Sequence, residues 1–227
     1  MNFLLHHHLA TRDLGAPAAS VGAMLPDLWR MADRRVFARK VDGAGENATV
    51  REVLAGIDHH VEIDRWFHAA PVFKSGERAT FDALRGASGA PRLGLFAHIA
   101  WELCLDGALL RSVGLEIMLD ALRESIAAVR PDAHIRAAEL HHFARVERTD
   151  DDRGLFERRI DRILDELSRG PWIEGYQTGD GIAARLEAVR ARLRFPAFTT
   201  EERSDVAAAF ERLRRRADTA VSEILGK

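Results

Sequence analysis

Helical periodicity runs through almost the whole chain, and it constrains the fold more than any other feature. Ala, Leu, Arg and Glu dominate the 227 residues, and apolar residues recur three and four positions apart. No stretch shows the alternating β-branched or aromatic residues of a half-buried strand. The sequence therefore predicts an all-α protein, with helices at about 17–39, 50–69, 76–86, 92–110, 113–129, 132–148, 152–169, 171–194 and 199–225.

The predicted helices are separated by short breaks that contain glycine or proline. These breaks are Gly43–Gly45, 86–91, Pro131, Gly170–Pro171 and Pro196. Thr199, followed three residues later by Glu202, has the spacing of a capping box, which predicts the start of the last helix. None of the breaks resembles a long flexible linker, so we expect a single compact helical domain over residues 1–227.

Charge and cysteine content narrow the class of protein. The chain carries 33 Lys and Arg against 35 Asp and Glu, so a strongly basic nucleic-acid surface is not expected. The single cysteine, Cys104, excludes an intrachain disulfide and a multi-cysteine metal site. The N-terminus lacks the features of a signal peptide, and no later window approaches the roughly 20 apolar residues of a membrane span. We therefore expect a cytoplasmic protein that binds neither nucleic acid nor membrane.

Histidine and carboxylate side chains recur at helical spacing in the segment 56–68. His60, Asp64 and His68 lie four and eight positions apart. At about 100° per residue, each step of four returns to within roughly 40° of the same direction, so the three side chains line one stripe of a helix. Because the neighbouring positions are apolar, this polar stripe is expected to face inward or into a cleft.

A second pair of the same kind lies in the apolar run Leu93–Leu110, where His98 and Glu102 stand one helical turn apart. Imidazole nitrogen and carboxylate oxygen from two helices suit zinc, manganese or iron, and such an ion would make a water acidic enough to attack near neutral pH. A buried polar network without metal is the alternative, because single His-x-x-x-Asp pairs are common in helices. The other internal histidines are interpreted as surface or core-edge residues: His7, His8, His59, His134, His141 and His142.

Several short motifs follow one another in order along the chain. They are the opening segment 1–10 with His6, the segment 21–28 with Asp27, the segment 56–64 with His60 and Asp64, Pro71, and the C-terminal pattern Trp172, Ile173, Tyr176, Gly181, Ile182, Leu186, Val189 and Arg192. In this order and spacing, over about residues 1–195, the chain resembles the acyl carrier protein phosphodiesterases. The final segment, 196–227, lies past the resemblance.

This resemblance implies a fold related to the metal-dependent HD-domain phosphohydrolases. It also implies a phosphodiesterase that releases 4'-phosphopantetheine from holo-acyl carrier protein, a reaction connected with fatty acid biosynthesis. The chain departs from the family at several positions: Val61 replaces an Arg, His68 and His98 replace acidic residues, and Trp101-Glu102-Leu103 replaces Trp-Asp-His. These departures keep a carboxylate and add nitrogen donors, which indicates a changed ligand set and allows a changed phosphodiester substrate.

Under this hypothesis the chain holds one or two divalent metals, of manganese, zinc, iron or magnesium. The predicted ligands are His60, Asp64, His98 and Glu102, with His6, Asp27 and His68 as further ligands or as residues that orient them. The predicted catalytic residues are Asp27, Asp64 and His68, because a carboxylate or imidazole that is not bound to the metal would protonate the leaving group.

A basic stretch at 30–40 follows Asp27 closely and includes Arg30, Arg34 and Arg35. One interpretation is that it grips a substrate phosphate or an acidic partner such as acyl carrier protein. The simpler interpretation is a solvated helix end, where positive charge is favoured by the helix dipole.

Two other functions fit the same residues. Helical zinc phosphodiesterases of the phospholipase C and P1 nuclease type use similar His and carboxylate pairs, but they are typically secreted and begin with a metal-binding Trp, and this chain shows neither feature. A non-catalytic helical binding protein derived from the same family is the third possibility, motivated by the changes at Val61, His68 and Leu103. Stoichiometric metal in the purified protein separates the enzymes from the binding protein.

Overall fold

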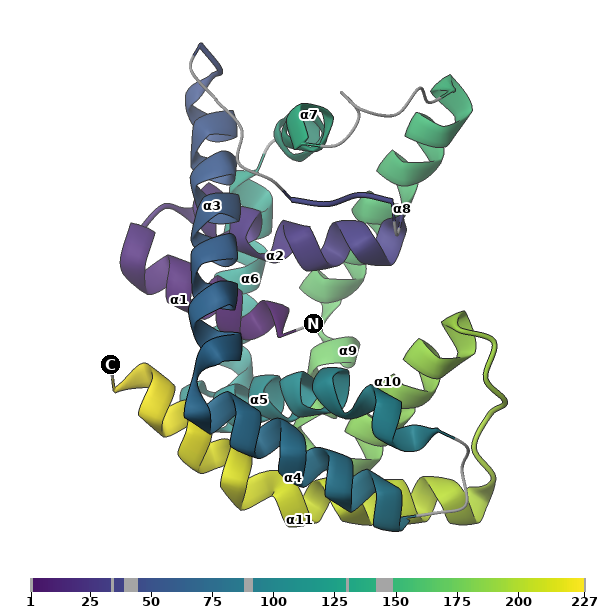
Figure 1. Cartoon of the computed structure of the whole chain (residues 1–227). Coiled ribbons are helices and arrows are strands. Elements are labelled where there is room, and N and C mark those ends of the chain that lie inside the picture. Colours follow the sequence, from purple (N-terminus) through teal and green to yellow (C-terminus); the bar gives the residue numbers. More distant parts are fainter. Residues whose placement is uncertain are drawn as a thin grey trace. The chain divides into compact units, whose positions relative to one another are not determined.

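A computed structural model describes residues 2–33, 35–38, 45–87, 92–129, 131–141 and 149–226. Over these residues the secondary structure is entirely helical, which confirms the predicted all-α class (Figure 1). The α-helices are α1 (Phe3–Leu14), α2 (Pro17–Ala32), α3 (Ala48–Ala69), α4 (Pro71–Ala87), α5 (Ala97–Val113), α6 (Leu115–Ala128), α7 (Pro131–His141), α8 (Asp150–Arg169), α9 (Pro171–Glu174), α10 (Gly179–Arg192) and α11 (Thr200–Leu225). The 3₁₀ segments are η1 (Leu93–Phe96) and η3 (Gly175–Gln177).

The chain divides into two compact units, each assembled from segments that are distant in sequence. Unit 1 comprises Met1–Asn2, Phe67–Leu115 and Pro171–Lys227, and unit 2 comprises Phe3–Trp66 and Glu116–Gly170. One boundary between the units falls inside α3, after Trp66. The prediction of a single domain over 1–227 concerns how the two units are joined, and it stays a prediction.

Helix α1 lies outside the predicted helices. Its first two turns are buried on nearly every side, with Phe3, Leu5 and His6 each no more than 1% exposed. A helix without a polar face lacks the amphipathic period that reveals a helix in a sequence. The three consecutive histidines, which are only moderate helix formers, weaken the pattern further.

Helix boundaries also differ from the prediction. The predicted helix 76–86 begins at Pro71, and the predicted helix 92–110 begins with the 3₁₀ segment η1. The predicted helix 17–39 ends at Ala32, because Asp33 adopts an extended conformation at the C-cap. The predicted helix 171–194 is interrupted at Gly175–Thr178, where Thr178 caps the new helix by accepting a hydrogen bond from the Gly181 backbone. The capping box of Thr199 and Glu202 is confirmed. The end of the predicted helix 132–148, from residue 142 onward, lies outside the described residues.

Within unit 1, α5 packs against α4, α10 and α11, and α4 lies beside α11 (Figure 1). The segment Leu93–Val113, which contains η1 and α5, is long and apolar enough to cross a membrane by length and composition alone. The prediction that no window approaches a membrane span is wrong by this criterion. Because 78% of it is buried within the protein, it has the burial of a core helix.

Within unit 2, α2 packs against α1 and α8, and it approaches α3 with almost no space between the backbones. A Cβ atom on Gly56 of α3 would lie 1.9 Å from the carbonyl oxygen of Ala19, and one on Gly22 of α2 would lie 2.2 Å from that of Val53. Only glycine fits at such distances. These two glycines therefore fix how α3 lies along α2, and they position the polar stripe that begins at His60.

Candidate metal centres

The first candidate centre, called here the buried triad, consists of His6 from α1 with His60 and Asp64 from α3, all in unit 2. One ligand atom from each residue lies within 4.8 Å of the others. The rings of His6 and His60 have centroids 3.9 Å apart, and Nε2 of His6 lies 3.8 Å from Oδ1 of Asp64. Three of the predicted ligands are therefore brought together by two helices.

The orientation of His60 follows from the close approach of α2 and α3. Gly56 contacts the backbone at Ala19, and one turn further along both helices Nδ1 of His60 lies 2.8 Å from the carbonyl oxygen of Ala23. A carbonyl oxygen can only accept a hydrogen bond, so Nδ1 carries the proton and donates it. In the neutral ring the lone pair is then on Nε2, which is the arrangement of a metal-binding histidine.

Burial keeps this imidazole neutral. Desolvation, together with the neighbouring His6, lowers the pKa of His60 to about 4, although the charges of Asp27 and Asp64 act in the opposite direction. At neutral pH a cation therefore has no proton to displace from Nε2. The influence of Asp27 on His60 also shows that this aspartate lies near the buried triad.

His6 has an environment that a cation would complete. The residue is 1% exposed, and in the described part of the chain neither of its ring nitrogens has a hydrogen-bond partner. Buried polar groups in native proteins are nearly always satisfied, and an unsatisfied one costs about 1–3 kcal/mol. A metal bound to His6 and His60 would remove this cost.

The second candidate centre, the open triad, consists of His68 from the end of α3 with His98 and Glu102 from α5, all in unit 1. Oε1 of Glu102 lies 3.3 Å from Nε2 of His68 and 3.3 Å from Nε2 of His98. The Glu102 side chain is 4% exposed, whereas those of His68 and His98 are 31% and 42% exposed. The carboxylate is therefore buried beneath two imidazoles that solvent can reach.

Charges within the open triad stabilise one another. The hydrogen bond to Glu102 raises the pKa of His98. Partial burial of the ring acts in the opposite direction, and a second hydrogen bond, to Glu77, raises the pKa again. Burial alone would raise the pKa of Glu102, but nearby positive charge, including that of His98, and hydrogen bonds from both imidazoles hold it well below its ordinary value. Without a metal, the open triad is thus a satisfied ion-pair network.

Two residues of the open triad's surroundings were missed in the sequence. Oε1 of Glu77, on α4, lies 3.0 Å from Nδ1 of His98, and the Phe73 ring packs against both imidazoles at centroid distances of 4.7 Å and 5.3 Å. The spacing of apolar residues in α4 could have predicted the position of Glu77. The buried residues Phe73, Gly76 and Thr80 recur at helical spacing, which places Glu77 at the margin of the buried face.

The donor atoms of both triads fit a transition-metal ion. Two imidazoles and a carboxylate are typical ligands of zinc, iron and manganese, whereas magnesium prefers oxygen alone. In a tetrahedral zinc site with bonds of about 2.0–2.1 Å, neighbouring ligand atoms are about 3.3–3.4 Å apart. The two 3.3 Å separations at Glu102 meet this requirement, and the 3.8 Å separation between His6 and Asp64 requires only a small adjustment.

The structure assembles the predicted ligands, which the sequence assigned to one or two metals, in two groups. His60 and Asp64 assemble with His6 and lie near Asp27 in unit 2, whereas His98 and Glu102 assemble with His68 in unit 1. His68, predicted as a catalytic or supporting residue, is thus an equal member of the open triad.

The predicted phosphate-binding arginines have different environments. Arg35 is engaged with carboxylates, since its Nη2 lies 2.9 Å from Asp33 and 3.5 Å from Asp152. Arg30 is exposed, with its guanidinium 5.2 Å from the centre of the Phe37 ring. Arg34 lies outside the described residues. Because α2 ends at Ala32, residues 35–38 are not part of a helix end.

Several remaining histidines have ordinary structural partners. Nε2 of His7 lies 3.0 Å from the Ser125 hydroxyl, Nε2 of His59 lies 3.0 Å from Asp13, and Nε2 of His134 lies 3.4 Å from Asp161. The prediction that these histidines are surface or core-edge residues is wrong for His7 and His134, which are 1% and 2% exposed because helices pack over them. The side chains of His141 and His142 lie outside the described residues.

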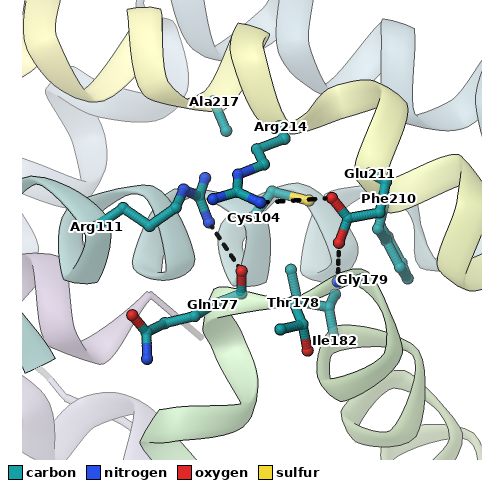
Figure 2. Close-up of a pocket in the computed structure, with 10 residues that line it drawn as sticks. All are labelled: Cys104, Arg111, Gln177, Thr178, Gly179, Ile182, Phe210, Glu211, Arg214 and Ala217. Carbon is teal, nitrogen blue, oxygen red and sulfur yellow. Dashed lines mark hydrogen bonds and ion pairs between the residues drawn. The ribbon is translucent and has the colours of Figure 1, made fainter.

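Unit 1 also contains a small pocket between α5, η3, α10 and α11, with little more room than one water molecule (Figure 2). Its polar groups are occupied by one another. Glu211 accepts a 2.6 Å hydrogen bond from the Gly179 backbone, and Arg111 contacts the carbonyl of Gln177 and bonds to Asp218 at 2.6 Å. We interpret this pocket as a structural joint between helices.

Comparisons with known proteins do not assign the chain to a group. No family model matches the sequence, no curated protein is similar to it, and no solved structure resembles it.

Proposed function

We propose that the chain is a metal-dependent phosphodiester hydrolase. The observation that carries the proposal is the buried triad. His60 is neutral there, directs its Nε2 lone pair away from the Ala23 carbonyl, and stacks on His6, whose nitrogens have no hydrogen-bond partner among the described residues. A protein core rarely retains this arrangement without a ligand. The open triad, with the same donor types, supports a second metal position.

The proposed substrate class comes from the resemblance of the sequence to acyl carrier protein phosphodiesterases. On that basis the substrate is the phosphodiester that links 4'-phosphopantetheine to an acidic carrier protein, and the fold is HD-domain-like. Of the three arginines predicted to bind phosphate, Arg30 is the one in the described residues that is exposed on α2, three residues after Asp27, and it would contact the phosphate. Arg35 contributes less, because Asp33 and Asp152 already neutralise it.

The chain's own residues then have distinct roles. His6, His60 and Asp64 bind one cation, and His68, His98 and Glu102 bind another. A bound divalent ion would supply Lewis acidity, which polarises the phosphodiester and makes water acidic near neutral pH. Asp27 acts on His60 through its charge but belongs to neither triad, so of the predicted catalytic residues it is the one left to donate a proton to the departing oxygen.

Metal analysis of the purified protein tests the proposal directly. We expect stoichiometric zinc, manganese or iron in the wild type, with reduced content in His60→Ala and His98→Ala. With metal restored, the wild type should release phosphopantetheine from holo-acyl carrier protein. Hydrolysis of only a generic ester such as bis(p-nitrophenyl) phosphate would retain the enzyme class and reject the carrier-protein substrate.

A non-catalytic helical binding protein is the second candidate. The observation that favours it is the open triad itself, whose hydrogen bonds satisfy His68, His98 and Glu102 without any ion. Absence of stoichiometric metal, together with normal folding of His60→Ala and His98→Ala, would establish this alternative and exclude the hydrolase.

A further inference from the structure

Glu77 stands apart from the ligands of the open triad, yet it contacts one of them directly. Its Oε1 lies 3.0 Å from Nδ1 of His98, and the Nε2 atom on the opposite side of that ring lies 3.3 Å from Glu102. We propose that Glu77 is a positioning residue that prepares His98 to bind a divalent transition metal. The inference rests on the proposed function, because it requires the open triad to be a metal site.

The contact between Glu77 and His98 determines which ring nitrogen of His98 carries the proton. A carboxylate accepts a hydrogen bond, so Glu77 holds the proton on Nδ1. When a metal replaces the proton on Nε2, the ring remains in the tautomer whose lone pair points towards Glu102 and His68. Carboxylate–histidine–metal arrangements of this kind orient the ring and increase its basicity.

The scaffold keeps Glu77 in place. Gly76 contacts α5 so closely that a Cβ atom at this position would lie 2.1 Å from the indole ring of Trp101. Trp101 is fully buried and follows His98 by three residues, so it lies on the neighbouring part of the same helix face. The Thr80 hydroxyl donates a 2.9 Å hydrogen bond to the Gly76 carbonyl. Helix α4 is thereby fixed against α5 one residue before Glu77.

Phe73 restricts the alternatives open to His98. Its ring, 2% exposed, lies 5.3 Å from the His98 ring and 4.7 Å from the His68 ring, in each case between centroids. A flip of the His98 ring would place carbon atoms where its two nitrogens now lie, and the bond to Glu77 would be lost. Packing by Phe73 and hydrogen bonding by Glu77 thus select the same ring orientation.

Zinc titration of Glu77 variants tests this role. The binding event of the open triad is first identified as the one that His98→Ala removes. Glu77→Ala should weaken that event by about 10- to 100-fold, the usual effect of removing such a partner. Glu77→Gln keeps an acceptor oxygen and should restore part of the affinity. Asp82→Asn is the matched control, because Asp82 is an exposed carboxylate on the same helix that pairs with Arg78 and not with His98.

A second readout does not depend on the metal. Long-range proton–nitrogen spectra of the metal-free protein, above the pKa of His98, should show the proton on Nδ1, beside the nearer carboxylate, in wild type and Asp82→Asn, and on Nε2, beside Glu102, in Glu77→Ala. If zinc binds Glu77→Ala as tightly as Asp82→Asn and the tautomer is unchanged, the role of Glu77 is refuted while the metal site stands. If the wild type has no event that His98→Ala removes, the metal site and the role of Glu77 both fail.

Discussion

The buried and open triads use the same three chemical groups, but they differ in what neutralises them. In the buried triad the imidazoles of His6 and His60 are 1% and 7% exposed, and burial holds His60 in its neutral form. In the open triad, His68 and His98 both contact Glu102, which raises the pKa of His98. In the buried triad, burial disfavours the protonated imidazole of His60, whereas in the open triad Glu102 favours the protonated imidazole of His98.

This difference assigns separate tasks to the two triads. A metal entering the buried triad meets a bare nitrogen on His60, whereas a metal entering the open triad must displace the proton that Glu102 favours on His98. Metal affinity should therefore depend on pH more strongly in unit 1 than in unit 2. The greater exposure of His68 and His98 makes the open triad the one that a dissolved substrate reaches directly.

The largest expected effect concerns Cys104, which serves as a reporter for unit 1. Burial raises the pKa of this thiol from 9.0 to about 12, and the residue is 3% exposed. Alkylation by iodoacetamide near pH 8 should be on the order of 10³-fold slower in the folded protein than in urea. Because the open triad is satisfied without metal, a chelator should leave this protection intact. Rapid labelling after chelation would show that unit 1 depends on metal, which would break the comparison.

The next effect is a free energy of unfolding whose pH dependence has opposite signs for the histidines of unit 2 and for His98 of unit 1. Burial lowers the pKa values of His7 and His60 from 6.5 to about 4. Their contribution to stability is complete above pH 6.5 and is lost as the pH falls from 6.5 towards 4, by at most about 3 kcal/mol each. His98 has a raised pKa, so its contribution is present below 6.5 and is lost as the pH rises through its folded value.

Urea unfolding of the chelated protein between pH 4.5 and 8 measures these slopes. His7→Gln, which keeps a donor near Ser125 and lies outside both triads, should flatten the acid side. His98→Gln should flatten only the alkaline side. A stability that is constant between pH 4.5 and 6.5 would mean that the imidazoles of unit 2 are not held neutral by burial.

A smaller difference is expected when one histidine is truncated in each triad. His60→Ala removes a buried ring and its 2.8 Å hydrogen bond to Ala23, so the metal-free protein should lose about 2 kcal/mol or more of unfolding free energy. His98→Ala should cost about 1 kcal/mol or less, because its imidazole is 42% exposed and Glu102 keeps His68 as a partner. Denaturant titration in the presence of chelator provides both values, and equal losses would contradict the assignment of burial.

The sequence predicts which residues of each triad share a helix face, but only within a single helix. The four-residue spacing of His60 and Asp64, and of His98 and Glu102, places each pair on one helix face, and the structure brings each pair together with a third residue. The prediction of an all-α fold also follows from local periodicity. These successes share one cause, since each depends on residues within a few turns of one another.

What the sequence does not reveal is which helices meet. His6 contacts His60 across 54 positions, and its own helix has no amphipathic pattern to announce it. Glu77 joins His98 only because Gly76 permits α4 to contact Trp101, and a glycine within a predicted helix does not identify its neighbour. Tertiary packing decides these contacts, so the sequence predicted one or two metals without dividing the ligands between them, and the structure groups His60 with His6 and His98 with His68.

The smallest expected effect tests whether the substrate binds beside the buried triad. Arg30 lies on α2 three residues beyond Asp27, and its only described contact is with the face of Phe37, which is worth about 0.5–1 kcal/mol. If it meets a substrate phosphate, Arg30→Gln should raise KM several-fold with little change in kcat, because a charge-assisted bond is lost in both bound states. Arg35→Gln is the matched control, since Asp33 and Asp152 already engage that guanidinium. An unchanged KM in Arg30→Gln would indicate that the phosphate binds away from α2, and would make the open triad of unit 1 the place to seek the substrate.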